Sequence, residues 1–226
     1  MDRKSRAAGR HAPHFGAVNQ FVLAAGWAVA GAAAGWFVRW GSVRLARLEE
    51  LQPGNLRWQV FGPPILSAVV FGAFAYHFGV TPTLFIRSVF ILVLVQVIFF
   101  DFEHRLILDR VIFPAMVVAL VVSLFGNPWW VGIATGLGAG LLFLLLALAG
   151  SAIFKAEALG FGDVKLAAFM GLLLGPLPTI QALFYGVFMA GVISVGMIVW
   201  RRSLKGTLAY GPYLAAGALI VLYLLP

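Results

Sequence analysis

The sequence predicts an all-helical membrane protein, a polytopic bundle of about eight transmembrane helices. Two observations support this fold class. Of the 226 residues, 62% are apolar and only 11% are charged, and the mean hydropathy is +0.98. A soluble domain carries ~25% charged residues. In addition, apolar stretches recur that are about 20 residues long, the length of helix that crosses the hydrocarbon core of a bilayer. Together they exclude a soluble globular domain.

Eight apolar stretches lie between polar or turn-forming connections. At about 21 residues each they use most of the chain, which leaves no room for a folded extramembrane domain. We therefore expect a basic N-terminal tail (1–16) and a single transmembrane domain (17–226). A seven-helix bundle is the alternative: the basic tail would fall on the outer side if the first stretch crossed the membrane, so that stretch could be something other than a true span. The predicted spans are 17–38, 60–80, 84–103, 108–126, 129–154, 163–177, 179–200 and 207–225.

The basic residues are distributed asymmetrically. The net charge of +8 and the isoelectric point of about 10.5 would suggest a polyanion partner in a soluble protein. Here eleven of the sixteen Lys and Arg residues fall in or beside alternate connections, after spans one, three, five and seven. Short cytoplasmic loops are enriched in Lys and Arg. These connections are therefore predicted to be cytoplasmic, and no nucleic-acid partner is expected.

Two features do not fit this distribution. The basic tail falls on the outer side if the first stretch crosses the membrane, and Arg87 lies inside the third span. We expect Arg87 to reach the interface from its helix end, as long basic side chains do.

The longest polar connection is the segment 39–59. Leu45, Leu48 and Leu51 recur at a spacing of three, and Pro53-Gly54 then ends the pattern. This pattern predicts a short helix on the cytoplasmic surface of the membrane, serving as a surface anchor or, alternatively, in substrate docking.

The chain contains no cysteine. It therefore has no disulfide, no thiolate zinc site and no thiol nucleophile.

The first group of candidate chemical residues is the run from Asp101 to Asp109, at the end of the third span. If the helix continued, Asp101, Arg105 and Asp109 would lie on one stripe, as in a salt-bridged helix end. Asp101 directly follows an apolar run and so lies at or inside the edge of the hydrocarbon. Ionisable groups in that position are candidates for function.

The second group is Gly160-Phe161-Gly162-Asp163-Val164-Lys165, at the start of the sixth span. Glycines permit unusual backbone angles and close approach of another backbone. Asp163 could simply cap the helix. However, the alternation of the spans puts Asp163 on the same side of the membrane as Asp101. Two carboxyl groups that face each other can share one proton, and the pair can then activate a water molecule.

At these motifs the chain resembles the type IV prepilin peptidases, which are membrane-embedded aspartyl proteases of the GxGD type. The resemblance rests on the run from Asp101 to Asp109, on the segment 160–166, and on Tyr210-Gly211-Pro212-Tyr213-Leu214-Ala215. It covers residues from about 57 to the C-terminus. It implies a bacterial inner-membrane protease that cleaves the leader of type IV prepilin or pseudopilin precursors at the cytoplasmic face, in pilus assembly or protein secretion.

The resemblance also implies roles for individual residues. Asp101 and Asp163 would be the catalytic pair, Gly160 and Gly162 would shape the loop, and Asp109 and Lys165 would be supporting residues. No cofactor is expected for proteolysis and no metal site is expected. Many relatives also methylate the new N-terminus with S-adenosylmethionine, and most carry a cysteine-rich zinc domain between the first two spans. The short, cysteine-free segment 39–59 excludes that zinc site and argues against methylation.

Two other functions remain open from the sequence. The same acids could serve a small proton-coupled transporter, or the chain could be a catalytically silent scaffold for pilus or secretion assembly. Among the remaining polar residues, Gln96 is expected to form an interhelical hydrogen bond, His104 to be a surface residue or a proton relay, and His77 to be structural.

Overall fold

The computed structural model describes residues 14–79, 81–154, 159–201 and 209–225. These residues form eight helices and contain no strand, which confirms the predicted all-helical bundle. The basic tail predicted at 1–16 lies outside the described residues up to residue 13. The helices are α1 (His14–Leu48), α2 (Arg57–Phe78), α3 (Pro82–His104), α4 (Asp109–Leu124), α5 (Trp130–Phe154), α6 (Phe161–Leu174), α7 (Pro176–Arg201) and α8 (Gly211–Leu224).

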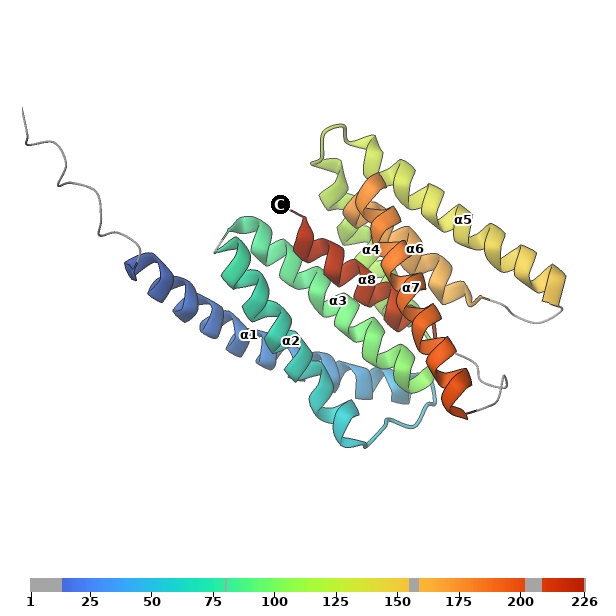
Figure 1. Ribbon diagram of the computed structural model, residues 1–226, viewed down its shortest axis with the longest axis horizontal. Coiled ribbons are helices and arrows are strands. Elements are labelled where there is room, and N and C mark those ends of the chain that lie inside the picture. The colour runs from blue at the N-terminus through green and yellow to red at the C-terminus, as the bar shows by residue number, and fades with distance from the viewer. Residues whose placement is uncertain (1–13, 80, 155–158, 202–208, 226) are drawn as a thin grey trace, which may run out of the picture.

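Five helices of the described chain are long and apolar enough to cross a membrane, namely α1, α2, α3, α5 and α7. α4, α6 and α8 are shorter, at 16, 14 and 14 residues. At about 1.5 Å per residue, 14 residues span only about 21 Å. α6 and α8 are packed among the longer helices (Figure 1), and about half of their residues or more are buried. The chain is therefore a multi-pass membrane protein with unequal helices.

α1 continues well beyond the predicted end of the first span. It runs without a break to Leu48, so residues 39–48 extend the first helix and do not form a separate short helix. Residues 39–48 contain no proline that would end the helix, and the pair Pro53-Gly54 comes only later. The longer helix also packs against the bundle, because Ala46 is buried. Glu50, with a φ of 58°, then turns the chain away from the helix.

α3 is the central helix of the bundle. It contacts α1, α2, α4 and α8 (Figure 1), and more than half of its residues are buried. Thr81 caps its N-terminus by accepting a hydrogen bond from the backbone of Leu84, at 3.2 Å. Because α3 is enclosed on most sides, a polar side chain near its end is held inside the protein.

Close helix contacts depend on small residues. A Cβ added at Gly31 of α1 would lie 2.6 Å from the carbonyl oxygen of Ser67 in α2. A Cβ at Gly171 of α6 would lie 2.6 Å from the Cα of Gly136 in α5. Such contacts are typical of membrane helices, whose association depends on close packing of backbones.

The guanidinium of Arg87, near the start of α3, has partners within the protein at the ends of α2 and α8. Arg87 is 8% exposed, donates to the carbonyl of Leu225 at 3.0 Å, and lies 4.0 Å from the ring centre of Phe78. The C-terminal end of α8 packs beside the start of α3, so the guanidinium finds partners within the protein.

Consecutive helices alternate in direction (Figure 1), so the connections 49–56 and 105–108 lie at the same end of the bundle. The short connections after α2, α4 and α6 lie at the opposite end. Of the basic residues used in the topology argument, Lys155, Arg202 and Lys205 lie outside the described residues.

Candidate functional site

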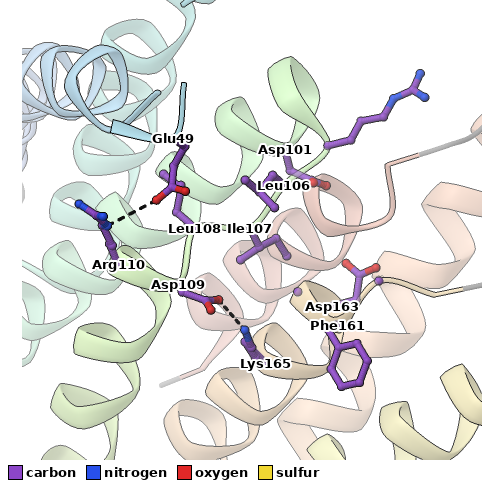
Figure 2. A pocket seen from close by; sticks show the side chains of 13 residues that line it. Glu49, Asp101, Leu106, Ile107, Leu108, Asp109, Arg110, Phe161, Asp163 and Lys165 are labelled. Atoms are coloured by element: carbon purple, nitrogen blue, oxygen red, sulfur yellow. Dashed lines mark hydrogen bonds and ion pairs between the residues drawn. The ribbon is translucent and has the colours of Figure 1, made fainter. Parts of the chain in front are cut away.

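The two aspartates singled out in the sequence line one cavity at the end of the bundle (Figure 2). Its volume is about 450 Å³. Asp101 belongs to the last turn of α3 and Asp163 to the first turn of α6. They are only 5% and 8% exposed. The two carboxylates are near enough for the charge of Asp101 to act on Asp163. The cavity is lined by Glu49, Asp101, Arg105–Arg110, Gly160–Asp163 and Lys165.

Each aspartate receives one backbone hydrogen bond from a neighbouring segment. The backbone of Gly211, at the start of α8, donates to Asp101, and the backbone of Gly160 donates to Asp163. A carboxylate has about four acceptor positions. Each group is therefore oriented by the protein and keeps acceptor capacity for a water molecule or a substrate.

Asp163 is not the N-cap residue of α6, as the alternative interpretation had it. The N-cap residue is Gly160, and Asp163 is the third residue of the helix, whose side chain bonds back to the N-cap backbone. That bond satisfies one of the donors that a helix N-terminus leaves free. Asp163 also lines the cavity, so a role at the helix start and a role at the site are compatible.

The two glycines before Asp163 differ in what they permit. Gly160 has extended backbone angles that any residue adopts, and a Cβ there would lie 3.7 Å from Asp163, an ordinary contact. A Cβ at Gly162 would lie 2.9 Å from the Cβ of Ile107, which is too close. Gly162 thus allows the start of α6 to approach the connection after α3.

The stripe expected from a continuous helix through Asp101, Arg105 and Asp109 does not form. α3 ends at His104, and Arg105 adopts the left-handed conformation with a φ of 54°. Asp109 instead begins α4 and pairs with Lys165 of α6, with 2.5 Å between Nζ and Oδ1. This ion pair joins α4 to α6 at the rim of the cavity, and its side chains are 55% and 27% exposed.

Two residues that the sequence argument does not single out lie near the aspartates, one lining the cavity and one beside Asp101. Glu49 reaches the cavity from the connection after α1 and pairs with Arg110 of α4, at 3.4 Å. In the sequence, Gly211 stands out only as part of the segment Tyr210–Ala215, whereas in the structure a Cβ there would lie 2.6 Å from Oδ2 of Asp101. The pair Gly211-Pro212, at the start of α8, is the feature of the sequence that could have marked this position.

The other polar candidates have structural partners. Gln96 accepts a hydrogen bond from Ser42 of α1 at 2.9 Å, which confirms the interhelical bond. The ring of His77 packs against Phe78 and Tyr223. His104 is largely buried, with its Nε2 3.3 Å from Glu103, so it is not a surface residue.

Within the described part of the chain, no group of three or more His, Asp or Glu residues could hold a metal ion. The cavity holds two buried carboxyl groups, with ion pairs among its lining residues.

Comparisons with known proteins agree with the sequence pattern. Residues 88–195 match the model of the type IV leader peptidase family. The chain is 29% identical over 160 residues to a prepilin leader peptidase/N-methyltransferase of Bacillus subtilis (strain 168). The aligned part covers 69% of this chain and 62% of the relative, so the chain spans about three fifths of that protein. No solved structure matches.

Proposed function

We propose that this chain, whose residues 88–195 match the model of the type IV leader peptidase family, is an intramembrane aspartic endopeptidase of the bacterial inner membrane. It cleaves the leader peptide of type IV prepilin or pseudopilin precursors at the cytoplasmic face. One observation supports this function above the others: two buried carboxyl groups from separate helices, Asp101 and Asp163, line a single cavity.

The proposed reaction uses a water molecule between the two carboxyl groups. The ionised carboxylate accepts a proton as the water oxygen forms a bond to the scissile carbonyl carbon, and the other carboxyl group donates its proton to the carbonyl oxygen. The tetrahedral intermediate then collapses, the C–N bond breaks, and the leaving amine takes up a proton. No covalent intermediate with the enzyme forms and no cofactor is required.

The backbone donors at Gly211 and Gly160 support this assignment. Each fixes one carboxylate without using all of its acceptor positions. Positioning of reacting groups before the reaction accounts for a large part of enzymatic rate enhancement. Gly160, Gly162, Asp109 and Lys165 then act by shaping the loop and by joining the helices around the cavity.

The cytoplasmic location is supported by the charge distribution. The cavity lies at the end of the bundle that carries the connections 49–56 and 105–108. In the sequence, these connections are flanked by Arg47, Arg57 and Arg110. Basic residues in short connections favour the cytoplasmic side. A leader peptide on the cytoplasmic side of the membrane can then enter the cavity without crossing the bilayer.

The test is cleavage of a pilin precursor by purified full-length protein in detergent or liposomes. Asp101→Asn and Asp163→Asn keep the shape of the side chain and remove its acid-base chemistry. We expect each to lower the cleavage rate by about 10³-fold or more, within the range for loss of a general acid or base. Arg44→Gln is the control, because Arg44 is exposed and does not line the cavity.

Wild-type cleavage by either folded, inserted aspartate variant would contradict the proposed mechanism. A scaffold would keep its cellular role in both variants. A proton-coupled transporter would carry a proton flux in liposomes that the same variants abolish. The acids lie at helix ends, in the last turn of α3 and the first turn of α6, which is unlike a relay near the middle of the membrane.

Mass spectrometry of the mature N-terminus identifies the cleavage site and reports any methyl group.

A further inference from the structure

The last turn of α3, which carries Asp101, is also held by the connection between α1 and α2. We propose that this connection, residues 49–56, is a strap that positions Asp101, and that Arg39 and Glu103 are the positioning residues that hold it. The proposal rests on the proposed function, because it assigns the strap to the cavity of that site.

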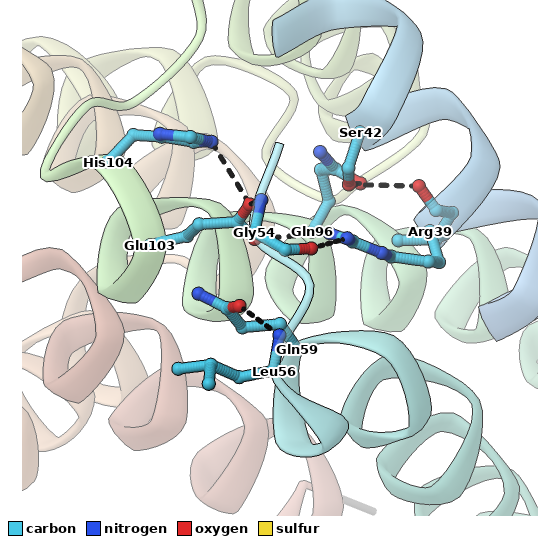
Figure 3. Close-up of polar contacts among 9 residues, drawn as sticks. Arg39, Ser42, Gly54, Leu56, Gln59, Gln96, Glu103 and His104 are labelled. Carbon is cyan, nitrogen blue, oxygen red and sulfur yellow. Dashed lines mark hydrogen bonds and ion pairs between the residues drawn. The ribbon is translucent and has the colours of Figure 1, made fainter. Parts of the chain in front are cut away.

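Polar contacts among Arg39, Gly54 and Glu103 hold the strap (Figure 3). One carboxylate oxygen of Glu103 accepts a hydrogen bond from Nη1 of Arg39, at 3.1 Å, and the other accepts from the backbone N–H of Gly54. Arg39 also donates through Nη2 to the carbonyl oxygen of Gly54. Each of the three groups thus contacts the other two.

These contacts are shielded from solvent. The side chains of Arg39 and Glu103 are 9% and 5% exposed. An exposed ion pair contributes little to stability, whereas removing one partner of a buried pair leaves a charge without compensation. The pair is thus a fixed part of the structure and can hold the strap in one place.

Apolar packing also holds the strap against the ends of α3 and α4. A small cluster, separate from the main core, joins the end of α1 and the strap to the ends of α3 and α4. Its buried members are Ala46, Phe100 and Leu108, and Leu45, Leu51 and Val111 pack against them. Phe100 directly precedes Asp101, and Glu103 follows it by two residues. The strap therefore contacts α3 on both sides of the aspartate in sequence.

The position of Asp101 explains why such fastening matters. The last turn of a helix has carbonyl groups without helical partners, and helix ends open more readily than helix centres. Asp101 lies in that turn, and its carbonyl accepts the backbone N–H of Arg105 at 2.8 Å. Gly211 holds the carboxylate from the side of α8. The strap holds the backbone of the same turn, so Asp101 is fixed between two elements.

The test compares variants of the full chain that loosen the strap without touching the cavity. Glu103→Gln and Arg39→Met remove the charge pair, and Arg39→Lys keeps the charge but loses the double contact. Arg44→Gln is the matched control on α1, since Arg44 is exposed and lies over the ring of Trp40. Thermal unfolding in detergent identifies the variants that fold, and Arg39→Lys carries the test if the others do not fold.

Two measurements are made on the folded variants. Hydrogen exchange at the amide of Arg105 reports opening of the last turn, and we expect it to be at least tenfold faster than in the wild type. Precursor cleavage separates kcat from KM. A misplaced catalytic group lowers kcat, since a displacement of about 1 Å costs about 10²-fold. We expect kcat to fall at least tenfold with KM within twofold, with Arg39→Lys between the wild type and the other variants.

The outcomes separate this inference from the proposed function. Unchanged exchange at Arg105 in folded Glu103→Gln would overturn the positioning role, and so would faster exchange with a wild-type kcat. If the wild type cleaves no precursor, the proposed protease function is wrong, and the exchange measurement alone then decides whether the strap holds this turn.

Discussion

Gly211→Ala tests directly whether the start of α8 positions Asp101. The added Cβ would lie 2.6 Å from Oδ2 of Asp101 and 3.1 Å from Cδ1 of Ile107. A carbon and an oxygen usually approach no closer than about 3.3 Å, so α8 or the carboxylate must move by about 0.7 Å. The backbone N–H of Gly211 moves with it, and its hydrogen bond to Asp101 is lengthened or lost.

The size of the effect follows from this displacement. Since misplacement of a catalytic group by about 1 Å costs about 10²-fold, we expect kcat to fall on the order of 30- to 100-fold. This corresponds to about 2 to 3 kcal/mol in activation free energy. The free energy of unfolding should fall by about 1 to 3 kcal/mol, the usual cost of overpacking.

The assay is precursor cleavage by purified protein, with kcat and KM measured separately and folding checked by thermal unfolding in detergent. Gly138→Ala is the matched control, because Gly138 lies in α5 and a Cβ there meets nothing within 4 Å. Folded Gly211→Ala with a wild-type kcat would refute the idea that this backbone positions Asp101.

Three further predictions concern the same cavity and the helices around it. Gly162→Ala should lower kcat at least tenfold and Gly160→Ala no more than about threefold, because only the first would press into the connection after α3; equal kcat values would contradict this. The coupling energy between Asp109 and Lys165, from a double-mutant cycle of unfolding free energies, should be below about 1 kcal/mol because the pair is partly exposed. A larger coupling would mean that the pair is structural. Gly171→Ala should lower the free energy of unfolding by about 1 to 3 kcal/mol, measured by denaturation in detergent, because its Cβ meets backbone atoms of α5; a stability equal to the wild type would contradict the close contact.

The membrane fold could be predicted from the sequence because it depends on composition and length. Apolar stretches of sufficient length must form helices in a bilayer, since no water is present to satisfy the backbone. That constraint acts within each segment, so the eight helices were found with errors mainly at their ends. The continuation of α1 to Leu48 was missed because its last turns are polar on several faces.

The two aspartates could be singled out because acids near apolar runs are rare and costly. Their neighbours in space could not be identified in this way. Arg39, Gly54 and Glu103 meet across up to 64 positions of sequence, and no local pattern marks such a meeting. Asp109 was placed on the stripe of Asp101 by helical periodicity, whereas the left-handed residue Arg105 ends that helix.

The sequence by itself determined that this chain is a helical membrane protein, which residues can do acid-base chemistry, and that thiolate metal chemistry is excluded by the lack of cysteine. Only the tertiary structure decided which elements hold those residues. α8 supplies a backbone donor to Asp101, Gly162 lets α6 approach the connection after α3, and the strap fastens the end of α3. The physical reason is that hydropathy acts on each segment separately, whereas the position of a catalytic group depends on contacts between segments far apart in the chain.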